Sequence, residues 1–202
     1  MKKILYLHGF GSSGSSGTVG LLRREFWEKV DPAHRATVLA PDIPVDPAVA
    51  FPMLEALAYD EMPDLTIGTS LGGTYAQQLR GFVRICVNPS FWLSKKYDIL
   101  HVGKHKWMSR RSDGETEFHI TKEIIAHYQE MEEHQFDGVT DDDRTLCHGL
   151  FGDEDTVLSA LTRPEFERHY PGMSRTFHGG HRLNDHVVTH TLLPFIQELG
   201  LL

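Results

Sequence analysis

Residues 64–73 combine a short apolar run with a glycine–serine–glycine pattern, and this combination constrains the fold more than any other feature of the chain. Residues 65–68 have the composition of a short buried strand, and the pattern G-x-S-x-G surrounds Ser70 directly after them. Such a chain turns so sharply from strand to helix that only glycine fits two residues before and two residues after the serine. We therefore predict that Ser70 lies in a strained turn between a strand and a helix, with its hydroxyl group accessible.

Apolar runs and helical patterns alternate along most of the chain. The predicted strands are residues 4–7, 36–39, 65–68, 83–87, 145–151 and 175–177. The predicted helices are residues 18–30, 47–58, 71–79, 163–169 and 187–199, and Pro194 should bend or restart the last one. This order predicts a single α/β domain over residues 1–202, with a mostly parallel central sheet and helices on both faces.

Two segments depart from this alternation. The Ser/Gly-rich residues 11–17 lie between a predicted strand and a predicted helix, so we interpret them as a loop of the fold. Residues 91–144 contain scattered basic and aromatic residues, a helical pattern near 122–134 and three consecutive aspartates at 141–143. We predict that residues 91–144 form a short cap-like insertion over the active site.

Charge and cysteine content exclude several classes of protein. The formal net charge of −8 over 202 residues argues against a protein that binds nucleic acid by neutralising phosphates. Cys86 and Cys147 each lie in an apolar run, which favours buried, reduced thiols over a disulfide. The apolar run that follows Lys2 and Lys3 is too short for a secretory signal, and no run resembles a membrane span. We expect a cytoplasmic monomer or homodimer without nucleic-acid or membrane partners.

A serine nucleophile needs a histidine as general base and an acid that orients this base. His181 follows a late strand and two glycines, whereas its rival His178 continues the strand, so we predict His181 as the base. Three carboxylates follow Gly152 at the end of the preceding strand. In many α/β-hydrolases the acid is the third residue after such a glycine. This position predicts Asp155, with Asp153 as the alternative acid and the glutamate between them as the weakest candidate.

The order of these residues along the chain indicates the type of fold. Ser70, then Asp155, then His181 is the order of α/β-hydrolases, and it differs from the orders on chymotrypsin-like and subtilisin-like folds. The backbone amide of Leu71, at the start of a helix, is the first predicted donor to an oxyanion. The amide of Phe10, in the loop after the first strand, is the second. A plain turn without catalytic function is the alternative for this loop.

Five motifs are distributed nearly end to end along the chain: Leu5-Tyr6-Leu7-His8-Gly9-Phe10, Gly68-Thr69-Ser70-Leu71-Gly72-Gly73, Val87-Asn88-Pro89, Gly152-Asp153-Glu154 with Val157-Leu158, and Gly179-Gly180-His181. With these motifs the chain resembles small bacterial esterases of the α/β-hydrolase superfamily, especially the YqiA/YcfP-like group. The resemblance implies Ser70 as nucleophile, His181 as base, and Asp155 or Asp153 as acid. The chain departs from the group by two extra residues in the acid motif and by Gly180, where the group tends to have asparagine.

Substrate contacts are predicted at His8, Phe91 and Trp92. The aromatic residues of the insertion, which include Trp107 and Phe118, form either an acyl pocket or a small core of the insertion itself. Because the insertion is short, we expect an open site that accepts short-chain acyl esters. A further group of basic residues could face an anionic substrate group such as a coenzyme A or a carboxylate, although a solvated surface is their more common role: Lys95, Lys96, Lys104, Lys106, Arg110 and Arg111.

We therefore predict a cofactor-free serine esterase that acts on a small-molecule ester. A thioesterase or acyltransferase with the same triad is one alternative, and a non-catalytic binding protein with this fold is another. Two histidine pairs have the i, i+4 spacing of a helical zinc site: His101 with His105, and His186 with His190. Neither pair has a third ligand at a suitable spacing, so no metal site is predicted.

Overall fold

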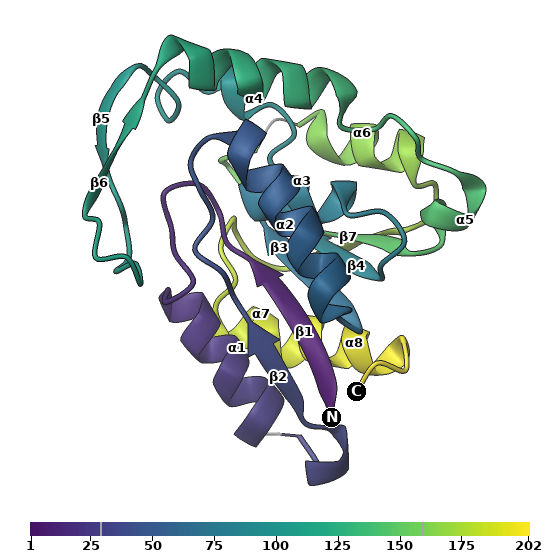
Figure 1. Cartoon of the computed structure of the whole chain (residues 1–202). Coiled ribbons are helices and arrows are strands. Elements are labelled where there is room, and N and C mark those ends of the chain that lie inside the picture. The colour runs from purple at the N-terminus through teal and green to yellow at the C-terminus, as the bar shows by residue number, and fades with distance from the viewer. Residues whose placement is uncertain (29, 159) are drawn as a thin grey trace.

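A six-stranded parallel sheet forms the centre of the computed structural model, which describes residues 1–28, 30–158 and 160–202 (Figure 1). Its strands are β1 (Lys2–Leu7), β2 (Ala36–Leu39), β3 (Leu65–Thr69), β4 (Arg84–Val87), β7 (Cys147–Gly152) and β8 (Ser174–Phe177). They lie in the order β2-β1-β3-β4-β7-β8, and every neighbouring pair is parallel. All six predicted strands are confirmed. The segments between them, most of which contain a helix, provide the crossovers that parallel pairing requires.

Helices cover both faces of this sheet, because successive residues of a strand point to opposite sides. On β1, Ile4 and Tyr6 pack with α1 (Gly17–Glu28) and the C-terminal helices. Leu5 and Leu7 pack on the other face, where α2 (Pro47–Glu61), α3 (Leu71–Gln78) and α6 (Thr162–His169) complete a second core.

Position 29 of the predicted helix 18–30 lies outside the described residues. No helix in the described part of the chain is long and apolar enough to cross a membrane.

The C-terminal helix is interrupted near Pro194, as the sequence predicts. The segment begins with α7 (Asp185–Val187), continues as a π-helix, η3 (Val188–Leu192), and restarts as α8 (Leu193–Glu198). Pro194 lies in the first turn of α8, where its missing N–H leaves no helical hydrogen bond unmade. The π-helix therefore ends directly before α8, the helix that starts anew with Pro194 in its first turn.

Most of the insertion lies across the carboxyl ends of the strands, whereas its last part, residues 141–144, lies at the amino ends, where Asp143 forms an ion pair with Arg84 at the start of β4 (Figure 1). It comprises the 3₁₀-helix η2 (Leu93–Lys95), the antiparallel hairpin β5 (Gly103–Lys106) and β6 (Glu117–Ile120), α4 (Lys122–His134) and α5 (Asp141–Arg144). The predicted helix 122–134 matches α4, whose N-terminus is capped by the Thr121 side chain. The sequence did not predict the hairpin, because β5 reads Gly-Lys-His-Lys and has no apolar alternation.

Candidate active site

Ser70, Asp155 and His181 come from the same edge of the sheet. Ser70 follows β3, Asp155 follows β7 and His181 follows β8. The carboxyl ends of parallel strands meet at one edge, and ligands of open α/β sheets bind outside this edge. The three predicted triad residues, which are 111 positions apart at their extremes (181 − 70), therefore lie at one end of the molecule.

The backbone of Ser70 has the strained conformation that its sequence pattern predicts. Its φ of 55° and ψ of −121° lie outside the regions that residues with a side chain normally adopt. A Cβ atom on Gly68 would lie 2.0 Å from the Gly72 carbonyl oxygen, and one on Gly72 would lie 2.0 Å from the Leu7 carbonyl oxygen. Glycine is thus required at both positions. Such a conformation costs on the order of 1–3 kcal/mol, which is typical of functional sites.

His181 and Asp155 form a short, partly buried hydrogen bond. His181 Nδ1 lies 2.7 Å from Asp155 Oδ2, and the Asp155 side chain is only 5% exposed. The other carboxylate oxygen, Oδ1, accepts the backbone N–H groups of Val157 and Leu158 at 2.8 and 3.1 Å. These contacts fix the carboxylate, and Nδ1 of His181 is then the protonated nitrogen that donates to it. Nε2 is left as the nitrogen that can accept a proton.

Asp153, the alternative acid, points to a different histidine. His178 Nδ1 lies 3.3 Å from Asp153 Oδ1, and both side chains are largely exposed. The backbone N–H of Gly179 also donates to Asp153, and this hydrogen bond is the main cause that lowers the pKa of the carboxyl. The carboxylate between the two aspartates, Glu154, lies 3.8 Å from His178 Nε2. The geometry thus favours Asp155 over Asp153 as the partner of His181.

The predicted oxyanion donors belong to segments next to Ser70. Leu71 begins α3, and the first amides of a helix have no partner within the helix. A Cβ on Gly9 would lie 3.2 Å from Ser70 Cβ, so the loop that carries Phe10 passes directly beside the nucleophile. Over the described residues, no acceptor within the chain receives the amide of Phe10 or Leu71. Both amides are therefore available to an oxyanion.

His8 is buried and has a backbone partner on each ring nitrogen. Nδ1 donates to the Gly9 carbonyl at 2.9 Å, and Nε2 accepts the backbone N–H of Ile43 at 3.1 Å. The side chain is 4% exposed, and burial lowers the pKa of His8 to about 4, so the ring is neutral at physiological pH. This placement favours a structural role, in which His8 holds the loop of Phe10. It does not favour the predicted contact of His8 with substrate.

Acid should destabilise the protein through His8. The unfolded-state pKa of histidine is about 6.5, and the folded-state pKa of His8 is lower, about 4. The contribution of neutral His8 to the free energy of unfolding is therefore fully present above pH 6.5 and is lost as the pH falls toward 4. Between pH 7 and pH 4.5 the wild type should lose about 2 kcal/mol more free energy of unfolding than His8→Asn. Urea titration of both proteins at the two pH values measures this difference. His119→Asn, at an exposed histidine, is the control and should keep the wild-type acid sensitivity.

Asn88 is a site residue to which the sequence analysis assigned no role, although it belongs to one of the five motifs. It is fully buried and adopts a left-handed conformation, which asparagine tolerates better than most residues. Its Nδ2 donates to the carbonyls of Gly180 and His181, both at 3.1 Å, and its Oδ1 accepts the N–H of Gly152 at 2.8 Å. Asn88 therefore ties the turn of His181 to the end of β7. The motif Val87-Asn88-Pro89 was the available signal.

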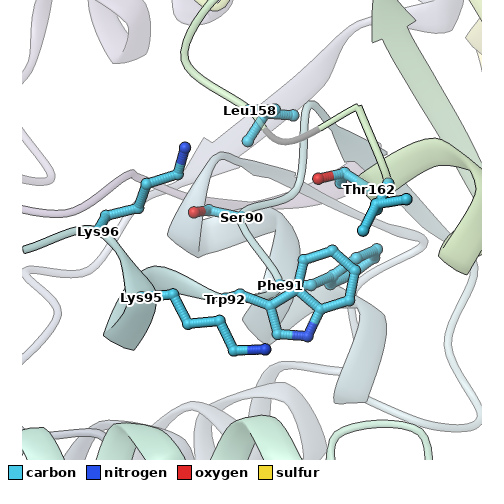
Figure 2. A pocket seen from close by; sticks show the side chains of 8 residues that line it. Ser90, Phe91, Trp92, Lys95, Lys96, Leu158 and Thr162 are labelled. Atoms are coloured by element: carbon cyan, nitrogen blue, oxygen red, sulfur yellow. The ribbon is translucent and has the colours of Figure 1, made fainter.

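Ser70 and His181 line the same cavity, which has a volume of about 690 Å³. The insertion supplies part of its wall: Leu93, Lys96, Ile99, His105, Lys106, Met108, Ser109 and Phe118. Phe91 and Trp92 line a second pocket of about 290 Å³ (Figure 2). Trp107 instead lies under the guanidinium of Arg111, 4.2 Å from the ring centre. The aromatic residues of the insertion are thus divided between pocket walls and the packing of the insertion.

Neither predicted histidine pair assembles into a larger cluster. His105 lies on a strand and not on a helix, with its ring 4.5 Å from that of His101. His186 and His190 lie in the C-terminal helical segment, also with rings 4.5 Å apart. Across residues 1–28, 30–158 and 160–202, no group of three or more His, Cys, Asp or Glu side chains is arranged to hold a metal ion.

Comparison with known proteins finds one matching family and many similar structures. The family model described as "Uncharacterised protein family (UPF0227)" matches residues 3–107, which is more than half of the 202 residues. The matched segment contains the loop of Phe10 and the turn of Ser70. No curated protein matches the sequence.

Three of the similar structures are a protein named Est1E, a lipase and a thioesterase domain. Est1E from Butyrivibrio proteoclasticus is 16% identical, with a TM-score of 0.66, and the match covers 98% of this chain and 87% of that one. The monoacylglycerol lipase of Paleococcus ferrophilus is 13% identical, with a TM-score of 0.62 and coverage of 98% and 93%. The thioesterase domain from the curacin biosynthetic pathway is 12% identical, with a TM-score of 0.56 and coverage of 98% and 91%. These matches confirm the predicted α/β-hydrolase fold.

Proposed function

The chain belongs to the uncharacterised protein family UPF0227, and we propose that it is a serine hydrolase that cleaves small carboxylic esters through Ser70, His181 and Asp155. One observation carries this proposal. The His181–Asp155 hydrogen bond of 2.7 Å lies at the cavity that also contains the strained Ser70. A base oriented by an acid, beside an accessible hydroxyl and two available amides, is the arrangement that acyl transfer requires.

In the proposed reaction the Ser70 hydroxyl attacks the ester carbonyl while His181 Nε2 takes its proton. Asp155 holds the ring and stabilises the imidazolium that forms. The carbonyl oxygen becomes an oxyanion, which the amides of Leu71 and Phe10 stabilise. His181 then protonates the leaving alcohol, which departs and leaves an acyl group on Ser70. Water activated by His181 releases the acid and restores the free serine.

The same residues would cleave a thioester, because the acyl-enzyme step is common to both substrates. The thioesterase domain among the similar structures supports this alternative. An acyltransferase would form the same acyl-enzyme, with another acceptor in place of water. A purely binding role is less well supported, because it gives no reason to retain a strained serine beside an oriented histidine. Parallel assays with acetyl and butyryl esters of oxygen and sulfur distinguish an esterase from a thioesterase, and a binding protein should turn over neither.

A reducing, cytoplasmic setting is also proposed. Cys86 and Cys147 lie on neighbouring strands with their Sγ atoms 3.8 Å apart, yet both are free thiols. Free thiols at this distance are expected where disulfides do not form, as in the cytosol.

Short-chain esters should be the better substrates. Residues of the insertion close one side of the cavity, and they limit the length of acyl chain that fits. We expect kcat/KM for p-nitrophenyl acetate and butyrate to exceed that for the dodecanoate by about tenfold or more, because atoms that do not fit a pocket cost about 1–3 kcal/mol each. Initial rates at substrate concentrations below micelle formation measure this ratio. Equal or faster turnover of the dodecanoate would contradict a short acyl pocket.

A further inference from the structure

A second pocket opens beside the cavity that contains Ser70. It has a volume of about 290 Å³ and shares Ser90 and Lys96 with the larger cavity. Ser90 connects the two spaces closely, because its backbone N–H donates to the Ser70 carbonyl at 3.1 Å. Figure 2 shows Ser90 near the centre of the pocket, between Lys96 and the rings of Phe91 and Trp92.

The walls of this pocket are mainly apolar and partly aromatic. Phe91 is fully buried, and its ring meets that of Trp92 edge to face at a centroid distance of 6.2 Å. Leu158 and Leu161 line the pocket from the segment that follows Asp155. The ring of Trp92, which is only partly buried, is the accessible flat surface of this wall, and such a surface favours a ring or another planar group over a polar chain.

Two lysines stand at the edge of these apolar walls. Lys95 Nζ lies 5.5 Å from the ring centre of Trp92, and Lys96 Nζ donates to the Val157 carbonyl at 2.7 Å. An ammonium group has three N–H donors, so Lys96 retains two for another partner. Within the part of the chain that the structure describes, neither lysine forms an ion pair with a carboxylate.

Glu132 interacts electrostatically with Lys95, but its carboxylate already forms hydrogen bonds with another residue. Glu132 is buried, and its two oxygens accept the backbone N–H and the hydroxyl group of Ser94. Its carboxylate therefore leaves the ammonium of Lys95 without a direct ionic partner. Ser90 is 8% exposed and its side chain lines the pocket, which adds one polar group beside the two charges.

The position of the pocket identifies the part of the substrate that it would hold. Among the described residues, none from the loop 9–12, which carries the oxyanion donor Phe10, lines the pocket. Part of its wall is formed by the segment after Asp155, the partner of His181. His181 itself lines the larger cavity, and Ser90 and Lys96 line both spaces, so the two are adjacent. A leaving group that His181 protonates in the larger cavity can therefore extend past Ser90 into the second pocket.

We propose that the pocket of Ser90, Trp92, Lys95 and Lys96 binds the leaving group of the substrate and selects a planar alcohol that carries an anion, such as a carboxylate. The assignment to the leaving group rests on the proposed function, whereas recognition of the anion does not need catalysis. Because the chain has a net charge of −8, its overall field repels anions, and local lysines are needed to overcome this repulsion.

Binding of a matched pair of ring compounds tests the anion site without any catalysis. Calorimetry should show that the wild type binds 4-hydroxybenzoate about five- to tenfold more tightly than 4-hydroxybenzamide, the range expected for partly exposed charge contacts. In Lys95→Gln/Lys96→Gln this preference should fall to about one. The control Lys104→Gln/Lys122→Gln removes the same charge at exposed lysines outside the pocket and should keep the wild-type preference.

Kinetics with the corresponding acetyl esters then test the assignment to the leaving group. The ratio of kcat/KM for 4-acetoxybenzoate to that for 4-acetoxybenzamide should fall about five- to tenfold in Lys95→Gln/Lys96→Gln, and general losses of activity cancel in this ratio. Equal binding of the two ring compounds by the wild type, or a preference unchanged in the double variant, overturns the inference. Absence of Ser70-dependent hydrolysis of neutral p-nitrophenyl acetate would instead refute the proposed function and, with it, the leaving-group assignment.

Discussion

Replacing Ser70 with alanine is expected to lower kcat for p-nitrophenyl acetate by about five to six orders of magnitude, the size of effect seen when a triad serine is removed. The reason is that no acyl-enzyme can form without the hydroxyl group, and His181 then has no nucleophile to activate. Steady-state rates of the purified variant, corrected for spontaneous hydrolysis, measure the loss.

Two controls separate this effect from a folding defect. Thermal unfolding of Ser70→Ala should resemble that of the wild type, because the substitution removes one oxygen atom and leaves the backbone turn in place. Ser109→Ala changes another serine of the same cavity and should retain most of the activity. If Ser70→Ala keeps more than a small fraction of the wild-type rate, the nucleophile is a different residue.

Replacing Asp155 with asparagine should have the second largest effect, a loss in kcat of about 10⁴-fold. Asparagine has a similar shape, but its amide group cannot stabilise the imidazolium and favours the wrong tautomer of His181. The matched variant Asp153→Asn removes the carboxylate that faces His178 and should keep nearly wild-type activity, because that pair is largely exposed. Assays of both variants from pH 6 to pH 9 measure the difference between the two aspartates.

The opposite result would be equally informative. If Asp153→Asn causes the larger loss, then His181 changes its partner during catalysis and the hydrogen bond to Asp155 is only structural. Equal, small losses in both variants would indicate that the histidine needs no carboxylate partner.

The sheet could be predicted from the sequence because local periodicity determines most of it. Five of the six strands contain a short apolar run, whereas β8 reads Ser-Arg-Thr-Phe, and most of the helices between them have apolar residues at helical spacing. The hairpin of β5 and β6 could not be predicted in this way. β5 has no apolar side chain, and β6 contributes only Phe118 and Ile120. The two strands pair only with one another, so the hairpin depends on packing such as the edge-to-face contact of Phe118 with Phe10 at 5.6 Å.

The position of Ser70 could also be predicted, because the constraint on Gly68 and Gly72 is local. Asp155 and Asp153 are two residues apart, and only the three-dimensional course of the loop after β7 shows which of them reaches His181. The role of Asn88 was hidden for a similar reason. Its partners lie 64 to 93 positions away along the chain, and no local pattern indicates them.

The basic residues of the insertion illustrate a further limit of sequence interpretation. Six lysines and arginines between positions 95 and 111 resemble one another in sequence, yet of these only Lys95 and Lys96 line the second pocket, and only Lys96 and Lys106 line the cavity that contains Ser70. Arg111 packs on a tryptophan, and Lys104 forms an ion pair with Glu117. Fold, and not composition, determines which charges can contact a ligand.

Labelling with a fluorophosphonate followed by peptide mapping tests the proposed nucleophile most directly. The cavity contains four other serines, Ser12, Ser16, Ser90 and Ser109, so the position of the adduct distinguishes an activated serine from an accessible one. We predict a single adduct on Ser70 in the wild type and no adduct in Ser70→Ala. An unlabelled wild type, or an adduct on any other serine, would contradict the assignment of Ser70 as the nucleophile of a serine hydrolase.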